Sequence, residues 1–572
     1  MGAPLRRRPV GAALLRLFPL AALIVLVAPV AAGIAGIVLP AFGYLPVLGS
    51  TEFSLAPFRA LAAMPGLGRS VLLSLGTGLA TTAAAFAVVM LFVAGWRGTR
   101  VFAALERLVS PLLSVPHAAA AIGLALLIAP SGVVFRLLAL AAGWERPPDL
   151  LIVQDRDGLA MTLGLVLKEI PFLLLMTLAA LPQTRAAETD RLMRTLGYGR
   201  IAAFFYGVLP ALYRQIRLAT LAVLAFSTAV VDVALILGPT TPAPLAVRIL
   251  EWQRAPDLDM HFVAAAGALL QLGVTLSALL AWLAAERLGA FLCRRFARSG
   301  RRARRDAWLR RLSALLMSLS AGTVLAGLGV LAVWSVAGVW RFPDVFPDGL
   351  TLMTWMRLAG SLVDPLLNSV SIALAASLVA IALALGSLEF EARSGRTASG
   401  RALQALYVPL LVPQVSFLFG LQILFSFLGV DGTFAAVVTG HLVFVFPYVL
   451  LSLAEPWWSW DPRYGHAMRA LGKTADSVFW RVRLPMLARP VLTAAALGFA
   501  ISVGLYLPTL LIGGGRRPTV TTETVALASG GDLRLVGATA LVQALLPFLG
   551  FALAAFVPAV LFRNRRRLRV AA

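Results

Sequence analysis

The chain has 572 residues, of which 60% are hydrophobic and only 13% are charged, and its mean hydropathy is +0.87. A soluble domain could not bury so many apolar side chains, so the composition excludes an ordinary soluble enzyme and predicts a membrane protein. The net charge of +24 alone would suit a nucleic-acid partner. The positions of the charges, described below, argue against one.

Twelve apolar runs are long enough to be predicted as membrane-spanning helices, since a span needs about 20 mostly apolar residues. The first run is longer than the core of a signal peptide, which is about 7–15 residues, and is therefore predicted to be a retained helix. No run alternates with period two, so we expect an all-α polytopic protein. The runs lie near residues 15–39, 70–94, 108–129, 159–181, 216–238, 262–285, 313–339, 366–388, 404–428, 433–454, 490–512 and 536–562.

The basic residues are distributed unequally between the two predicted sides of the membrane. When the loops are assigned alternately to the two sides, most Lys and Arg fall on the side of the N-terminus. This bias predicts that both termini and the Arg-rich segment 294–311 are cytoplasmic. We interpret that segment as a solvated basic face rather than a lipid or nucleic-acid site. The single cysteine, Cys293, and four scattered histidines give no support for a disulfide framework or a metal cluster.

The chain contains an internal repeat. LKEIPFLLLMTLAALP (167–182) resembles FVFPYVLLSLAEP (444–456), and RTLGYGRIAAFFYGVLP (194–210) lies over RALGKTADSVFWRVRLP (469–485). Each half holds six predicted spans, an even number, so the halves are expected to be parallel repeats about an axis along the membrane normal. The predicted organisation is a first helix and outer loop (1–65), module 1 (66–287), a basic cytoplasmic linker (288–312), a seventh helix and outer loop (313–365) and module 2 (366–572).

The matched loops carry a shared pattern on the predicted cytoplasmic side. Gly197 precedes Leu209-Pro210, and Gly472 precedes Leu484-Pro485 at the same spacing. The intervening apolar residues recur at helical spacing, which predicts a short amphipathic helix below the membrane in each half. The Gly472-Lys473-Thr474 sequence is not a phosphate-binding loop, because Ala467 occupies the place of its first glycine and no strand is predicted before it.

At these residues the sequence resembles the type I membrane subunits of ABC importers, whose cytoplasmic signature is E-A-A-x-x-x-G-x9-I-x-L-P. The Gly, Leu and Pro positions match in both copies. Ala467 matches one alanine and Val482 replaces the isoleucine of the second copy, whereas Gly207 stands at that position in the first. Arg191 and His466 replace the acidic residue, which removes any ion pair expected from that position. Two fused modules resemble the double-permease branch that includes iron(III) and thiamine importers.

The resemblance implies a translocation subunit with no catalytic site and no bound cofactor. It implies two cytoplasmic ATPase subunits that use ATP and Mg²⁺, a periplasmic solute-binding protein, and halves that rock between inward-open and outward-open states in a bacterial inner membrane. The residues implied to receive the ATPase stroke are Arg191, Gly197, Phe204, Phe205, Leu209 and Pro210 in the first loop, and His466, Ala467, Gly472, Phe479, Val482, Leu484 and Pro485 in the second.

Ionisable residues within the spans are costly and indicate a cavity or a partner. Lys168 and Glu169 either line a pathway or form an internal ion pair that holds helices together, and Asp232 either meets a cationic solute or is structural. The weaker pathway candidates are Ser227, Gln414 and Tyr506, and the histidines His117 and His441 are interpreted as packing residues.

Two other functions remain as alternatives. An ion-coupled secondary transporter would use Glu169 and Asp232 for proton or Na⁺ coupling, but it would have no use for the paired Gly and Leu-Pro loops. A membrane-embedded enzyme would need a nucleophile and base or a metal constellation, and the sequence displays neither.

Overall fold

The computed structural model describes residues 15–300, 302–395 and 405–561, and this part of the chain is built from helices with two isolated β-bridges. The expected cytoplasmic position of the two termini falls outside the described residues. The first half comprises α2 (Leu17–Ala41), α3 (Ala56–Ala62), α4 (Leu67–Trp96), α5 (Arg100–Val109), α6 (His117–Ile128), α7 (Val133–Ala142), α8 (Leu159–Ala180), α9 (Ala186–Thr195), α10 (Arg200–Ala203), α11 (Leu209–Thr228), α12 (Asp232–Leu237), α13 (Leu245–Gln253) and α14 (Asp259–Arg298).

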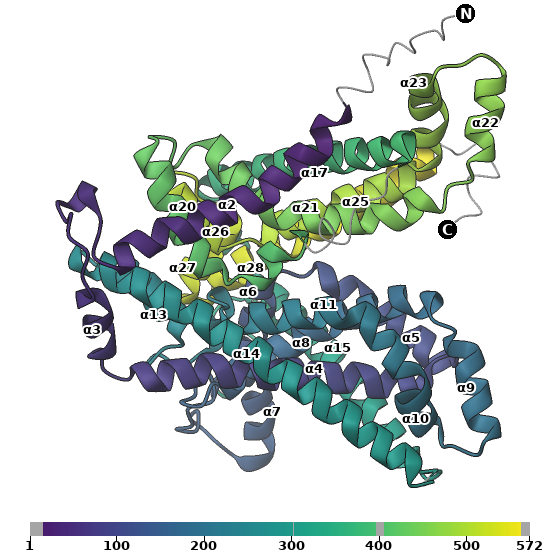
Figure 1. The fold of residues 1–572 in the computed structure, drawn as a ribbon. Helices are drawn as coiled ribbons and strands as arrows, with labels where there is room; N and C mark the ends of the chain where they lie inside the picture. The colour runs from purple at the N-terminus through teal and green to yellow at the C-terminus, as the bar shows by residue number, and fades with distance from the viewer. Residues whose placement is uncertain (1–14, 301, 396–404, 562–572) are drawn as a thin grey trace, which may run out of the picture.

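The second half repeats this order of long and short helices (Figure 1). Its members are α15 (Ala307–Val336), α16 (Met353–Ser361), α17 (Val363–Ser394), α19 (Val408–Leu411), α20 (Gln414–Phe427), α21 (Phe434–Trp458), α22 (Arg463–Ala470), α23 (Ala475–Val478), α24 (Leu484–Met486), α25 (Ala488–Gly504), α26 (Leu507–Gly513), α27 (Val520–Ala528) and α28 (Leu533–Leu561). The all-α polytopic fold with two parallel repeats is therefore confirmed.

Ten helices in the described residues are long and apolar enough to cross a membrane, and an eleventh is counted if the bent pair Ala475–Met486 and Ala488–Gly504 forms one span. The remaining predicted run, 404–428, contains α20, whose 14 residues are fewer than a straight span needs. Twelve is therefore higher than the number of long helices, although every predicted run contains a helix.

Four predicted spans were wrong in their continuity, and one of them, 404–428, divides into α19 and α20. The run 108–129 begins as the 3₁₀ turn Ser110–Ser114, because two prolines precede α6. The run 216–238 breaks between α11 and α12, and 490–512 breaks between α25 and α26. Hydropathy reports only how apolar a segment is, so it does not detect these breaks.

The first helix of each half packs against the other half. Helix α2 lies along α20 and α17 of the second half, and α15 lies along α6 and α4 of the first half; each also contacts its own half, α2 through α14 and α15 through α28. Both crossings are made at glycine: a Cβ added to Gly420 would overlap the carbonyl oxygen of Gly33, and one added to Gly123 would lie 3.0 Å from the Gly327 backbone. Small residues allow membrane helices to approach closely, so these contacts join the two halves.

We predict that Gly420→Ala destabilises the folded chain, because the new methyl group meets backbone rather than a flexible side chain. Overpacking of this kind costs about 1–3 kcal/mol. Thermal unfolding of the detergent-purified chain should show a lower midpoint than wild type. The control is Gly329→Ala on α15, where an added Cβ meets open space. Equal midpoints for the two variants would contradict the proposed importance of this crossing.

Candidate functional site

The two matched loops lie at the same end of the molecule, on separate halves (Figure 1). In each loop a helix ends at a glycine with positive φ, +86° at Gly197 and +74° at Gly472. The glycine N–H donates to Arg194 in the first loop and to Arg469 in the second, and the next N–H donates to Met193 or Met468. Glycine adopts this left-handed conformation without strain, so each loop turns sharply at a defined point.

A short helix and a π-helical turn follow each glycine, at a constant offset of 275 residues. The turns are η4 (Phe204–Val208) and η5 (Phe479–Arg483). They lead directly into α11 in the first half and into α24 in the second. The repeat inferred from the sequence therefore extends to an uncommon local structure, since π-turns are rare in helices.

In the first loop, the apolar face of the predicted amphipathic helix is directed inward. Phe204 is only 1% exposed, and Ile201 and Val208 are also buried in the core of their own half. Phe205 and Leu209 are half-buried, whereas Pro210 is exposed. The apolar face that follows Gly197 packs against the core of its own half.

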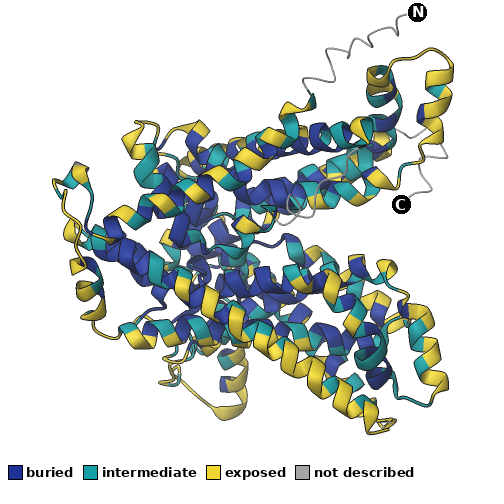
Figure 2. Cartoon of the chain, viewed as in Figure 1, coloured by how far each residue is buried: buried dark blue, intermediate teal, exposed yellow. Residues whose placement is uncertain are grey.

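The helices that precede the glycines, α9 and α22, are largely exposed (Figure 2). On α9 and the residue after it, Arg191, Leu192 and Leu196 are exposed. On α22 and its C-terminal turn, His466, Ala467 and Leu471 are exposed, and Leu471 is 74% accessible. Exposed apolar side chains therefore precede the glycine in both loops.

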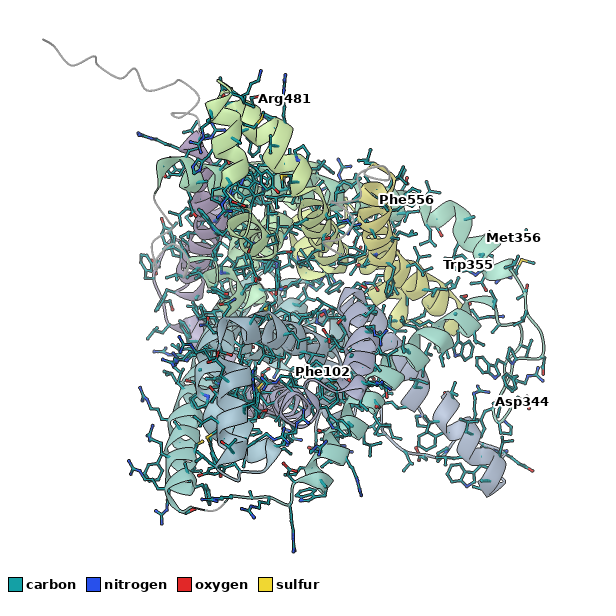
Figure 3. All side chains as sticks on the ribbon, turned by 90° about the vertical axis from the view of Figure 1, so that its right-hand side faces the viewer. Phe102, Asp344, Trp355, Met356, Arg481 and Phe556 are labelled. Carbon is teal, nitrogen blue, oxygen red and sulfur yellow. The ribbon has the colours of Figure 1, made fainter. Side chains whose placement is uncertain are left out.

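The second loop exposes more aromatic surface than the first. Trp480 is 65% exposed, and Phe479 is half-buried with its ring 6.2 Å from Trp457. Figure 3 shows Arg481 projecting at the margin of this half. The half-buried residues Val482, Leu484 and Pro485 lie at the base of the loop.

Ion pairs that sequence reasoning missed hold the second loop. Arg393 lies 2.6 Å from Glu389 and 2.6 Å from Asp476, and Arg483 lies 3.3 Å from Glu389. The Arg483 guanidinium also stacks 3.8 Å from the centre of the Trp457 ring. The four-residue spacing of Glu389 and Arg393, directly after the predicted span 366–388, was the signal that could have identified part of this network.

The adjacent residues Lys168 and Glu169 of α8 contact different partners. The Lys168 ammonium donates to backbone carbonyls around the Ser110–Ser114 turn, including Leu112 at 3.1 Å. Glu169 Oε1 lies 3.6 Å from His117 Nε2. Both residues are buried and join α8 to neighbouring elements. Each therefore has a structural contact, but Lys168 and Glu169 do not form an ion pair with each other.

Polar residues from both halves gather near the two helix breaks. Asp232 begins α12 directly after the first break, and Tyr506 precedes α26 at the second. His117 and Tyr506 both lie close enough to Asp232 for their charges to interact with it. Ser227 is buried just before the first break. Treating His117 as a packing residue was therefore incomplete, because it lies between two carboxylates.

Two further polar residues occupy repeat-related or bridging positions. Gln414 is half-buried at the start of α20, the position that His117 occupies in α6. His441 is buried, and its ring nitrogens lie 2.7 Å from Ser502 Oγ and 2.8 Å from Thr509 Oγ1. His441 thus bridges the break between α25 and α26. Irregular backbone within a membrane is tolerated where it is buried in protein or lines a cavity.

Comparison with known proteins agrees with this geometry, although no protein-family model matches the chain. The chain is 34% identical over 511 residues to the inner membrane ABC transporter permease protein YnjC of Escherichia coli (strain K12), covering 89% of this chain and 91% of YnjC. It is 30% identical over 189 residues to the molybdenum transport system permease protein ModB of Mycobacterium tuberculosis, covering 29% of this chain and 70% of ModB.

The putative 2-aminoethylphosphonate transport system permease protein PhnV of Salmonella typhimurium is 26% identical over 208 residues, which cover 36% of this chain and 77% of PhnV. ModB and PhnV each match about a third of this chain but most of their own lengths, as two fused permease units would predict. Because YnjC matches nearly end to end, the chain belongs to the ABC transporter permeases, as a multi-pass inner membrane subunit rather than an enzyme.

Proposed function

We propose that the chain is the translocation subunit of an ATP-driven importer in which α9 and α22 each receive the movement of one cytoplasmic ATPase subunit. The ATPases bind ATP and Mg²⁺, and this chain binds neither. A periplasmic solute-binding protein delivers the solute at the opposite end. In this proposal the end that carries both loops is cytoplasmic, in agreement with the distribution of Lys and Arg.

The observation that carries the proposal is a helical path from the first loop to the first helix break. Residues Arg200–Thr228 form one run through α10, η4 and α11, and Asp232 begins the next helix four residues after Thr228. A movement of the loop would therefore be transmitted along a stiff element to the polar residues between the halves.

Gly207 connects the exposed helix to this path. A Cβ at Gly207 would lie 2.9 Å from both Met193 and Thr189 of α9, so the glycine allows α9 to lie directly against η4. This contact gives a physical reason for glycine where the family signature has isoleucine. Force on α9 would then reach α11 through packed atoms rather than through the flexible turn alone.

The second half supports a similar transmission with a different geometry. Ala475–Met486 meets Ala488–Gly504 at a bend of 73°. Arg483 lies just before this bend and is held by Glu389 and by the Trp457 carbonyl at 3.1 Å. We therefore propose that ion pairing stiffens the second lever, whereas helical continuity stiffens the first.

We predict that Leu196→Glu and Leu471→Glu each weaken ATPase association without preventing folding, because both leucines are exposed and lie on the proposed docking surface. A loss of about 1.4 kcal/mol would lower the affinity roughly tenfold. Copurification with the cognate ATPase and uptake in proteoliposomes measure the effect. Leu258→Glu, an exposed leucine between α13 and α14 away from both loops, is the control. Wild-type association of both loop variants would refute docking at these helices.

We also predict that uptake requires ATP and continues when the proton gradient is dissipated. Proteoliposomes that contain the complete transporter, with ATP inside and the binding protein outside, provide the measurement with and without an ionophore. Asp232→Asn should alter the apparent KM for solute while leaving the ATP requirement intact, because Asp232 lies at the break rather than in the coupling loops. The opposite result would favour ion coupling: the ionophore stops uptake by the wild type, and uptake by Asp232→Asn does not respond to the ionophore.

A further inference from the structure

A basic cavity lies beside the first loop, where the connection between the two halves passes over it. Its volume is about 370 Å³. Four arginines contribute to its wall, together with the glycine turn of the loop and one acidic residue. The lining residues are Arg194, Gly197, Tyr198, Gly199, Arg200, Arg304, Asp306 and Arg310.

The connection is bonded to the loop along its length. The Gly199 N–H donates to the Arg302 carbonyl at 2.9 Å, and Arg304 Nε donates to the Gly197 carbonyl at 3.1 Å. The Asp306 carboxylate accepts the Ile201 N–H at 2.9 Å. The cavity is therefore a built feature in which two segments about a hundred residues apart are held together.

The charges of the wall are not balanced by the protein. Arg194, Arg200, Arg304 and Arg310 supply four guanidinium groups, whereas Asp306 supplies the single carboxylate of the wall. The charges of Arg194 and Arg310 both act unfavourably on Arg200, and Asp190 offsets them only in part. The Arg194 guanidinium has no hydrogen bond or ion pair within the described residues. Converging guanidinium groups are the arrangement that binds oxygen-rich anions through paired N–H donors.

The second loop shows what a balanced arrangement looks like. There, Arg393 and Arg483 are paired with Glu389 and Asp476 from the same half. The first loop has no comparable set of carboxylates among the described residues of its cavity wall. The difference indicates that an anion from outside the chain completes the first site.

The cavity lies at the level where membrane helices end. Arg310 is in the first turn of α15, and its guanidinium lies 5.1 Å from the centre of the ring of Trp96, the last residue of α4. Trp96 Nε1 donates to the Arg310 carbonyl at 2.8 Å. Tryptophan is enriched at the membrane interface, where lipid phosphates are found, and basic pockets on the cytoplasmic side attract them.

We propose that this cavity binds a phosphate group, supplied by the headgroup of an anionic phospholipid or by free inorganic phosphate. The bound phosphate joins Arg194 of the loop to Arg304 of the connection and thereby ties α9 to the start of α15. In this proposal the basic segment 294–311 contributes to an anion site, whereas the sequence predicted only a solvated face. Within the part of the chain that the structure describes, only the first loop carries this site, so the two coupling loops differ in their dependence on an anion.

The test is native mass spectrometry of the full chain in detergent, titrated separately with phosphatidylglycerol and phosphatidylcholine. A second arm measures the thermal midpoint of delipidated chain in inorganic phosphate and in chloride at matched ionic strength. The site variants are Arg194→Gln alone and Arg194→Gln with Arg304→Gln. The matched control is Arg469→Gln, the same position in the second loop.

We expect at least roughly fivefold more phosphatidylglycerol than phosphatidylcholine retained, or a phosphate-dependent rise in the midpoint. Either response should be lost in both site variants and kept in Arg469→Gln, because the site variants remove charge-assisted hydrogen bonds to the phosphate. The arm that responds identifies the source as lipid or free phosphate. Arg194→Gln keeps the test valid if the double variant folds poorly. The proposal fails if neither probe binds above its control, if Arg194→Gln binds like wild type, or if only an added ATPase subunit occupies the site.

Discussion

The two halves are joined where α2 crosses α20 and α15 crosses α6, and both crossings depend on backbone meeting backbone at glycine. In a membrane the hydrophobic effect does not drive helices together, so dispersion contacts at close approach supply the association. Because each half contributes its first helix to the other, neither half is packed without its partner. This arrangement keeps the bundle as one unit while the opposite end carries two separate loops (Figure 1).

The polar residues lie where that bundle is interrupted. The break after Thr228 places α12 against α6 and α8, the helices that carry His117 and Glu169, and the break after Gly504 leaves Tyr506 near Asp232. A continuous helix would satisfy its own backbone and offer little to a polar solute, whereas a broken helix presents free backbone ends and side chains at one depth. In the proposed function, the helical path Arg200–Thr228 brings movement to this region, and the rest of the bundle supports it.

The repeats have the same local structure but are stabilised differently. Gly197 and Gly472 turn in the same way, and both loops contain a π-turn at the matched position. The first loop is bonded to the connection between the halves, which exists only once in the chain. Within the described residues the second loop has no such neighbour. It is held by the buried carboxylate of Glu389, the exposed carboxylate of Asp476 and an arginine stacked on tryptophan. When two copies are fused into one chain, a single segment connects them, and only one of the two loops can be bonded to that segment. This difference in chain connection is enough to make the two loops unequal.

The sequence by itself determined the membrane class, the all-α fold, the parallel duplication and the positions of the two loops, because apolar length, repeat spacing and the Gly and Leu-Pro pattern are local properties of the chain. Only the tertiary structure decided which face of each loop is exposed, where spans 216–238 and 490–512 break, and that His117 rather than Lys168 meets Glu169. Phe204 and Phe479 occupy equivalent places in the sequence, yet one is fully buried and the other is not. Burial and pairing depend on which distant segments pack against a residue, and helical periodicity contains no information about those tertiary contacts.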